Sequence, residues 1–203
     1  DILLGTQMVA KGLDFENVTL VGVINADQQL NNDDFRSQER TFDLLTQVVG
    51  RAGRGQYKGT AVIQTCNPEN DVIQIAARQD YDAFFKDELK TRKMLIYPPY
   101  CDICLIGFIG ENEPKVRVAS QKYTDRLKEK LSGEYKDLKI IALGPMTARV
   151  SKISNKFRYR LILKCKNTKR FRALMNELLK YTGTDRAYND VSVYIDINPE
   201  NII

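Results

Sequence analysis

The sequence predicts an α/β protein of two domains, a parallel-sheet domain over residues 1–96 and an α+β domain over residues 97–203. In the first part, short apolar runs alternate with amphipathic segments. In the second part, the predicted order is β-α-β-β-α-β with one strand to spare. The formal charge also changes, from −3 in the first part to +8 in the second. Between them, Tyr97-Pro98-Pro99-Tyr100 ends a helical stretch and restarts the chain in an extended conformation.

The first part contains three continuous apolar runs, at residues 2–6, 19–24 and 60–65. Runs of this kind suit strands of a parallel sheet that is buried on both faces. Between the second and third runs, residues 34–54 carry apolar side chains at helical spacing. The order strand, helix, strand therefore predicts a βαβ crossover.

The helix over residues 34–54 is expected to begin at an N-cap supplied by Asp33 or Asp34. After the third strand, residues 71–95 predict one or two amphipathic helices that pack against the sheet.

The second part has a different order, and its two helices carry the strongest pattern. Apolar residues recur every three or four positions in each, which predicts one buried stripe per helix. The pattern predicts strands at 101–109, 138–143, 148–153, 157–166 and 191–197, and helices at 114–131 and 168–181. This arrangement resembles a split-βαβ, ferredoxin-like domain.

The composition excludes several classes of protein. With 43% hydrophobic and 28% charged residues the chain is an ordinary globular protein and not a disordered one. No apolar run approaches the roughly 18 residues of a membrane span, and no secretory leader is visible, so we expect a cytoplasmic protein. There is no His, which excludes His-based acid–base catalysis, catalytic triads and most zinc sites.

The four cysteines leave only an all-cysteine or cysteine–carboxylate metal site open. Only Cys101 and Cys104 have ligand-like spacing, and positions i and i+3 of a strand face opposite ways. We therefore expect structural thiols in a reducing compartment and no metal site in this chain.

The chain opens on Asp1, and a strand-like run begins at its second residue. We interpret it as a piece cut inside a domain, with part of an active site upstream.

Two short stretches of the first part are shaped for phosphate. Gly5-Thr6-Gln7, continuing to Lys11-Gly12-Leu13-Asp14, follows the first strand, and glycines there let backbone N–H groups approach an anion. Gln47-Val48-Val49-Gly50-Arg51-Ala52-Gly53-Arg54 ends the first helix, where Arg51 and Arg54 are expected to share a helix face. Alone, the second stretch could equally be an ordinary helix C-terminus, with Gly ending the helix and Arg complementing its dipole.

The combination favours the phosphate interpretation. Gly-Thr-Gln after a strand, Ala-Lys-Gly-x-Asp-Phe, Asn25-Ala26-Asp27 after the next strand and Gln-x-x-Gly-Arg-x-Gly-Arg together resemble motifs V and VI of superfamily 2 helicases. Residues 34–40 and Tyr97-Pro98-Pro99-Tyr100 are similar to the PriA family of primosomal replication-restart helicases (primosomal protein N′). The resemblance covers the whole chain and includes Leu143-Gly144-Pro145 and the closing Asp196-Ile197-Asn198-Pro199.

The resemblance implies a fold and a function. Residues 1–96 would be the latter part of a second RecA-like helicase lobe, and residues 97–203 the family's C-terminal domain. The whole protein would be an ATP-dependent DNA helicase that recognises stalled replication forks and restarts replication through primosome assembly. Its partners would be forked and single-stranded DNA, single-stranded DNA-binding protein and primosome proteins. We expect a monomer without a membrane partner.

The resemblance also implies residue roles. Arg51 and Arg54 would contact the γ-phosphate of ATP as arginine fingers, each worth ~10³–10⁵ in rate. Gln47 would position the attacking water, and Gly50 and Asp14 would complete the ATP-binding set. The loop residues expected on the DNA backbone, where contacts carry no sequence information, are Gly5, Thr6, Gln7, Lys11 and Gly12.

Two parts of such an enzyme are absent from the sequence. There is no Gly-x-x-x-x-Gly-Lys-Ser/Thr, so the chain alone should not hydrolyse ATP, and ATP and Mg²⁺ would bind in the intact protein. The family's zinc-binding cysteine cluster would lie upstream, and none of the cysteines here matches it.

A basic segment marks the second part. From Arg149 to Arg172 there are ten basic residues and no acidic one. Alternation along residues 157–166 predicts a cationic row pointing outward, formed by Arg158, Arg160, Lys164 and Lys166. Such a row suits the phosphates of nucleic acid. Two other interpretations of this basic row remain open: a solvent-exposed face that binds nothing, and a binding site for an acidic protein.

Two other functions remain open for the chain. It could be a non-enzymatic module that binds nucleic acid or protein, or part of another superfamily 2 translocase. The α+β domain after the two prolines argues against the second.

Overall fold

The computed structural model describes residues 2–6, 17–53 and 58–202. The chain divides into two compact units, residues 1–91 and 92–203, which we call the first and second units. This division lies five residues before the predicted boundary. Each unit has its own hydrophobic core.

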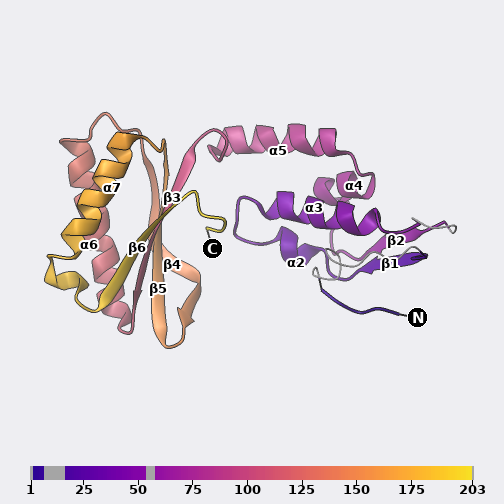
Figure 1. Cartoon of the computed structure of the whole chain (residues 1–203), viewed down its shortest axis with the longest axis horizontal. Helices are drawn as coiled ribbons and strands as arrows, with labels where there is room; N and C mark the ends of the chain where they lie inside the picture. Colours follow the sequence, from indigo (N-terminus) through magenta and orange to yellow (C-terminus); the bar gives the residue numbers. More distant parts are fainter. Residues whose placement is uncertain (1, 7–16, 54–57, 203) are drawn as a thin grey trace. The chain divides into compact units, whose positions relative to one another are not determined.

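The first unit contains a βαβ crossover, as predicted. Strands β1 (Leu20–Val23) and β2 (Thr60–Ile63) pair in parallel, with Leu20 opposite Thr60. The short helix α2 (Asp27–Leu30) and the longer α3 (Ser37–Val49) connect them (Figure 1). Parallel pairing requires a crossover of this kind, because a two-residue turn can join only antiparallel strands.

Two helices follow the crossover, α4 (Asp71–Ala77) and α5 (Tyr81–Leu95). Asn70 begins α4, since its side chain accepts hydrogen bonds from the backbone N–H groups of the first turn. Phe42 of α3 stacks on Phe84 of α5, with ring centres 4.2 Å apart. The core of the unit is formed by Ala26, Phe42, Leu45, Val72, Ile73, Ile75, Ala76 and Phe84.

Two expectations for the first unit were wrong. Residues 2–6 form no strand: Ile2 and Leu4 are 98% and 84% exposed, and no described strand pairs with them. An apolar run becomes a strand only where a neighbour accepts its backbone hydrogen bonds.

Helix α3 is also shorter than the predicted 34–54. Asp34 lies before its start: its side chain accepts a hydrogen bond from Arg36 N at 2.8 Å, and its carbonyl oxygen accepts one from Ser37 N at 3.0 Å. The N-cap position is Arg36, so the expectation of an N-cap at Asp33 or Asp34 was wrong. At the other end, Gly50 follows the last helical residue, consistent with the low helix propensity of glycine.

The second unit is a four-stranded antiparallel sheet with the strand order β4-β5-β3-β6. The order along the chain is β-α-β-β-α-β, as predicted. The elements are β3 (Asp102–Gly110), α6 (Glu113–Ser132), β4 (Ile141–Ile153), β5 (Lys156–Cys165), α7 (Lys169–Thr182), a 3₁₀ turn η1 (Arg186–Tyr188) and β6 (Val191–Ile197).

Helices α6 and α7 cover the same face of this sheet (Figure 1). The side chains of Asn112 and Thr168 cap their first turns. The apolar stripes of both helices lie in the core, as predicted. The ring of Tyr123 packs edge-on against that of Phe108, with ring centres 5.4 Å apart. Burying one such large side chain contributes about 1.5–3 kcal/mol, so this layer is the main source of the unit's stability.

The predicted strands at 138–143 and 148–153 form one irregular strand, β4. Its register against β5 shifts between Leu143 and Met146 and again between Thr147 and Lys152. The peptide bond between Gly144 and Pro145 is cis, and Gly144 has φ +109°. The prediction of two separate strands was therefore wrong, because bulges bend a strand without ending it.

Candidate functional site

The C-terminal end of α3 carries the residues predicted to bind ATP. Gln47 is exposed in the last turn, and Gly50 N donates to Thr46 O at 2.9 Å. Arg51 follows outside the helix, held by a hydrogen bond from its N to Val48 O at 3.1 Å. The expectation that Arg51 and Arg54 share a helix face was therefore wrong for Arg51, because α3 ends at Val49.

The segment after α3 is held against the start of both strands. Gly53, at φ +81°, donates its N–H to Val18 O at 3.0 Å, just before β1. A Cβ on Gly59, just before β2, would lie 2.1 Å from Gly53 N. Only glycine permits this approach, so Arg51 and Ala52 are fixed at the edge of the sheet where both strands begin.

Arg51 is half-buried, and its guanidinium makes no hydrogen bond or ion pair with the residues that the structure describes. Gly5 and Thr6 are exposed and lie outside any helix or strand. The remaining predicted ATP and DNA ligands of this unit, Gln7, Lys11, Gly12, Asp14 and Arg54, lie outside the described residues.

The opposite ends of β1 and β2 carry a polar cluster that was predicted only in part: Asn25-Ala26-Asp27 belonged to the motif resemblance, but Thr65 and Cys66 were not predicted as its partners. Asp27 accepts hydrogen bonds from Thr65 Oγ1 and Cys66 N, both at 2.8 Å. These bonds, the one from Cys66 N first, hold the pKa of Asp27 below its ordinary value. The Asn25-Ala26-Asp27 sequence after β1 was the available signal, and its structural effect is to join the two strand ends.

In the second unit, the predicted alternation along β5 is correct. Leu161 and Leu163 lie in the core under the helices, whereas Arg160 and Lys164 point to the opposite face. The predicted outward exposure was wrong for Lys164, which is only 8% exposed. Its Nζ donates to Leu95 O at 2.6 Å, and burial lowers its pKa.

Arg160 is also engaged within the unit. It is half-buried, its Nη1 donates to Ile202 O, and its Nε is buried without a partner among the described atoms. Ile202 itself is buried at 5% exposure. Of the predicted cationic row, Lys166 is exposed and Arg158 half-buried.

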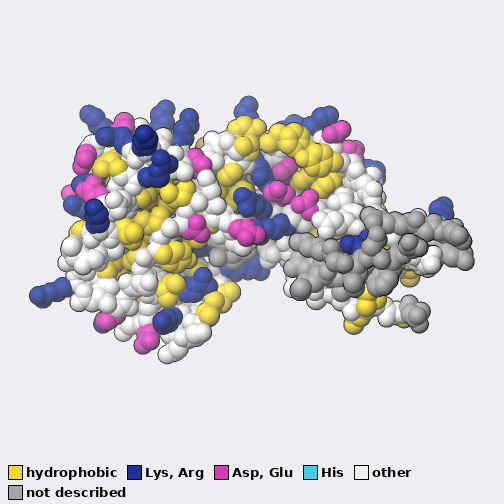
Figure 2. Space-filling view, in the orientation of Figure 1, with side chains coloured by type: hydrophobic (Ala, Val, Ile, Leu, Met, Phe, Trp, Pro, Cys, Tyr) yellow, Lys and Arg dark blue, Asp and Glu magenta, His cyan; other side chains and the backbone are white. Residues whose placement is uncertain are grey.

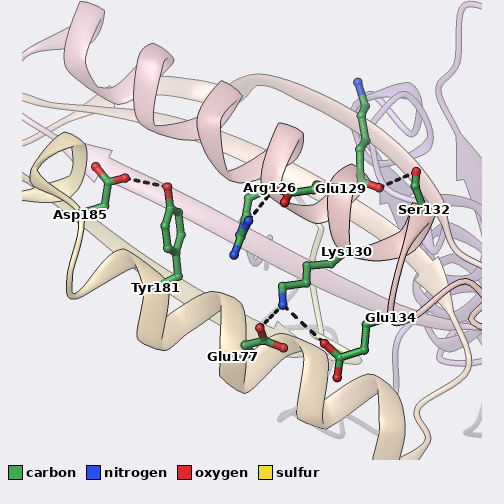
Figure 3. A network of polar contacts seen from close by, with 9 residues as sticks. Arg126, Glu129, Lys130, Ser132, Glu134, Glu177, Tyr181 and Asp185 are labelled. Carbon is green, nitrogen blue, oxygen red and sulfur yellow. Dashed lines mark hydrogen bonds and ion pairs between the residues drawn. The ribbon is translucent and has the colours of Figure 1, made fainter.

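The helix layer of this unit pairs many of its charges. Lys130 lies between Glu177 and Glu134, and Tyr181 donates to Asp185 at 2.6 Å (Figure 3). Lys122 reaches the same carboxylate of Asp185 at 2.5 Å. These bonds, from Lys122 first and then Tyr181, hold the pKa of Asp185 well below its ordinary value.

Three cations of the hairpin formed by β4 and β5, namely Lys152, Lys156 and Arg158, have no ion-pair partner among the described residues. Of these, Lys152 lies over the Phe157 ring at 4.6 Å. Figure 2 shows cationic and apolar side chains on the lower part of the second unit, with some acidic ones among them. The described surface therefore divides into a charge-paired helix layer and a basic hairpin.

The four cysteines are free thiols, and Cys104 and Cys165 are buried. Burial raises the pKa of each of these two to about 12. Among the described residues, no cluster of three or more potential metal ligands was found. No described helix has both the length and the hydropathy needed to cross a bilayer.

Residues 93–200 match the family model described as the Primosomal protein N C-terminal domain. The chain is 41% identical to the replication restart protein PriA of Bacillus subtilis, over 98% of its own length and 24% of the relative's. It is 43% identical to PriA of Synechocystis over 81% of its length and 19% of the relative's. Against PriA of Borreliella burgdorferi the identity is 38%, covering 100% of the chain and 30% of the relative. The chain thus spans about a quarter of these relatives.

Proposed function

The chain belongs to the PriA family of replication restart proteins, and from this premise we propose that it is the C-terminal part of an ATP-dependent DNA helicase. In this proposal the intact protein recognises stalled or abandoned replication forks and restarts replication by primosome assembly. The observation that carries it is the similarity to PriA along nearly the whole chain, through both structural units.

The first unit supplies part of a RecA-like helicase lobe in this proposal. Its parallel strands and α3 crossover are compatible with such a lobe, whose sheet is parallel. The half-buried Arg51 is held by its backbone at the start of the strands and keeps its guanidinium available. A cation fixed in this way costs little reorganisation when it meets the charge that develops on a phosphoryl group.

The proposed ATP site combines Arg51 and Arg54 as arginine fingers with Gln47, Gly50 and Asp14. ATP, the substrate, and Mg²⁺, its cofactor, would bind only in the intact protein, because the phosphate-binding loop that would hold them is absent from this sequence. We assign Gly5, Thr6, Gln7, Lys11 and Gly12 to contacts with the backbone of the tracked DNA strand. Zinc, in this proposal, belongs to the upstream part of the protein.

The second unit supplies a DNA-binding domain. No Asp or Glu occurs from Leu138 to Asn176, whereas the same stretch carries the basic residues of β5 and its flanks. A surface of this composition gains binding energy by releasing counterions from phosphates. Primosome proteins and single-stranded DNA-binding protein are the proposed protein partners, and the protein acts as a cytoplasmic monomer.

A comparison of this chain with the intact protein tests the proposal. Fluorescence anisotropy over a salt series should show binding of the chain to forked and single-stranded DNA, weakening steeply with salt. The chain alone should hydrolyse no ATP, while the intact protein should hydrolyse ATP and unwind forks in the presence of DNA. Absence of DNA binding at low salt would overturn the DNA-binding assignment. ATP hydrolysis by the intact protein that does not depend on DNA would overturn its assignment as a DNA-driven helicase.

A further inference from the structure

The connection between β4 and β5 forms a narrow basic hairpin, whose end, residues 149–158, we call the hairpin tip. Ile153 pairs with Lys156 and Lys152 with Phe157, so the turn contains only Ser154 and Asn155. Both turn residues have positive φ, 49° and 61°, the conformation of a tight two-residue hairpin turn. The tip is therefore a closed two-stranded ribbon, a form that fits the major groove of a duplex.

An irregularity of β4 widens this ribbon below the turn. Residues 148–151 of β4 lie opposite the single residue Arg158 of β5, between the pairs of Thr147 and Lys152. Ala148 is buried, but Arg149, Val150 and Ser151 are exposed. A bulge of this kind re-aims side chains away from the sheet, so Val150 points outward although it belongs to a strand.

Cations lie on both faces of the hairpin tip. The cross-strand pair of Lys152 and Phe157 shares one face, and Ile153 shares the other with Lys156 and, two residues along, Arg158. Next to the tip on β5, Tyr159 OH donates a hydrogen bond of 3.2 Å to the carboxylate of Glu113. Tyr159 packs on the helix side, so Arg158, its neighbour along the strand, points away from that carboxylate.

Apolar side chains are exposed among these cations. Val150 is 52% exposed and Ile153 47% exposed. Phosphate contacts need cations alone, whereas apolar side chains that touch nucleic acid insert between or against unstacked bases. Two β-branched apolar residues within four positions, flanked by Lys152 and Lys156, therefore suit a place where bases are already unpaired.

We propose that the hairpin tip binds DNA at the junction between duplex and single strands, with Lys152, Lys156 and Arg158 on backbone phosphates and Val150 and Ile153 against the exposed bases. This inference rests on the proposed DNA-binding function and adds the site and the DNA structure that it recognises. It also moves the main phosphate contacts from the middle of β5 to the hairpin, because Lys164 and Arg160 bind backbone carbonyls within the unit.

The charge test uses the triple variant Lys152→Gln, Lys156→Gln, Arg158→Gln in the 203-residue chain. Fork binding should weaken at least tenfold at 0.1 M salt, and the slope of log affinity against log salt should fall by about 2–3 because up to three phosphate contacts are lost. The matched control replaces three exposed lysines outside the hairpin, Lys128, Lys136 and Lys180, with Gln. That control has the same net charge and should bind nearly as the wild type does.

The apolar test uses Val150→Ser together with Ile153→Ser and a fork carrying 2-aminopurine at the junction. The wild type should change the fluorescence of this base on binding, and the double variant should not. The preference for fork over plain duplex should also fall, while the salt slope stays unchanged. Both positions are exposed, and thermal unfolding of the variant checks that the fold is intact.

The outcomes separate the two proposals. If the wild type binds forks and the charge variant binds them equally with the same salt slope, the assignment of the hairpin tip is overturned and DNA binding stands. If the wild type binds no DNA at low salt, both proposals are overturned. If the charge variant loses an acidic peptide ligand but keeps fork binding, the hairpin tip is a protein-binding surface and the inference fails.

Discussion

The Nζ atom of Lys164 lies 3.7 Å from the centre of the Tyr97 ring and donates a hydrogen bond of 2.6 Å to the Leu95 carbonyl oxygen. Leu95 is the last residue of α5, where the carbonyl groups have no partner within the helix. A cation at this position also complements the negative end of the helix dipole. The charge of Lys164 is therefore used inside the second unit, where it fixes the end of α5 to β5.

Replacing Lys164 with Met should destabilise the second unit and leave DNA binding largely unchanged. The variant keeps the length of the side chain but loses the bond to Leu95 and the cation over Tyr97, at a cost of about 1–3 kcal/mol. Urea denaturation measures this loss. Lys166→Met, two residues along, just past the end of β5 and exposed, is the control and should be near neutral. A stable K164M protein with tenfold weaker fork binding would return Lys164 to the DNA surface.

Residue patterns predicted the order of elements in the second unit and the inward and outward sides of β5, because alternation is a local property of a strand. They did not predict that Lys164 is buried. Its cover comes from Leu95 and Tyr97, about 70 positions away in the sequence. Arg160 is covered in the same way by Ile202. Contacts between distant segments carry no signal in the pattern of one strand.

The candidate ATP site was predicted only in part for a related reason. The pattern identified Gln47, Gly50 and Arg51, but it extended the helix through Arg51. The end of α3 depends on tertiary contacts, such as the bond from Gly53 N to Val18 O and the close approach of Gly59. The glycines in the sequence indicate that the backbone is free to adopt unusual conformations there, but they do not indicate which other segment packs against it.

The stability of the helix layer should depend on pH through Asp185. Its pKa is lowered in the folded state, so the stabilisation is fully present above the ordinary value of 3.8 and is lost as the pH falls through the lowered pKa. Asp185→Asn should therefore lower the melting temperature at pH 7, and this difference should shrink below pH 3. Asp125→Asn, an exposed carboxylate of α6, is the control. A difference that persists unchanged in acid would show that packing of Asp185, and not its charge, is responsible.

Gly144→Ala should destabilise the second unit by about 1–3 kcal/mol, because φ +109° is a strained conformation for any residue with a Cβ. The added Cβ would also lie 3.0 Å from Arg160 O. Gly183→Ala is the matched control, since that glycine has φ −74° and ordinary space around it. Urea denaturation of both variants compares them directly. Equal stability of the two would mean that β4 adjusts its irregular backbone at no cost.

In the intact protein, Arg54→Ala should abolish DNA-stimulated ATP hydrolysis, with a loss of roughly 10³-fold or more, because a finger cation offsets charge on the phosphoryl group being transferred. Arg51→Ala should act in the same direction, since Arg51 is held in place by the backbone after α3 and its guanidinium is unused by the described residues. Both variants should keep fork affinity within about twofold, because the proposed DNA contacts lie elsewhere.

Arg78→Ala is the control for the arginine variants, since it removes an exposed arginine of the first unit that follows α4. Its turnover should equal that of the wild type. ATP hydrolysis is measured at saturating DNA and again without DNA, so that a loss of coupling is distinguished from a loss of chemistry. Near-normal turnover by R54A and R51A would remove the finger role from both arginines, and a parallel loss of fork affinity would assign them to DNA instead.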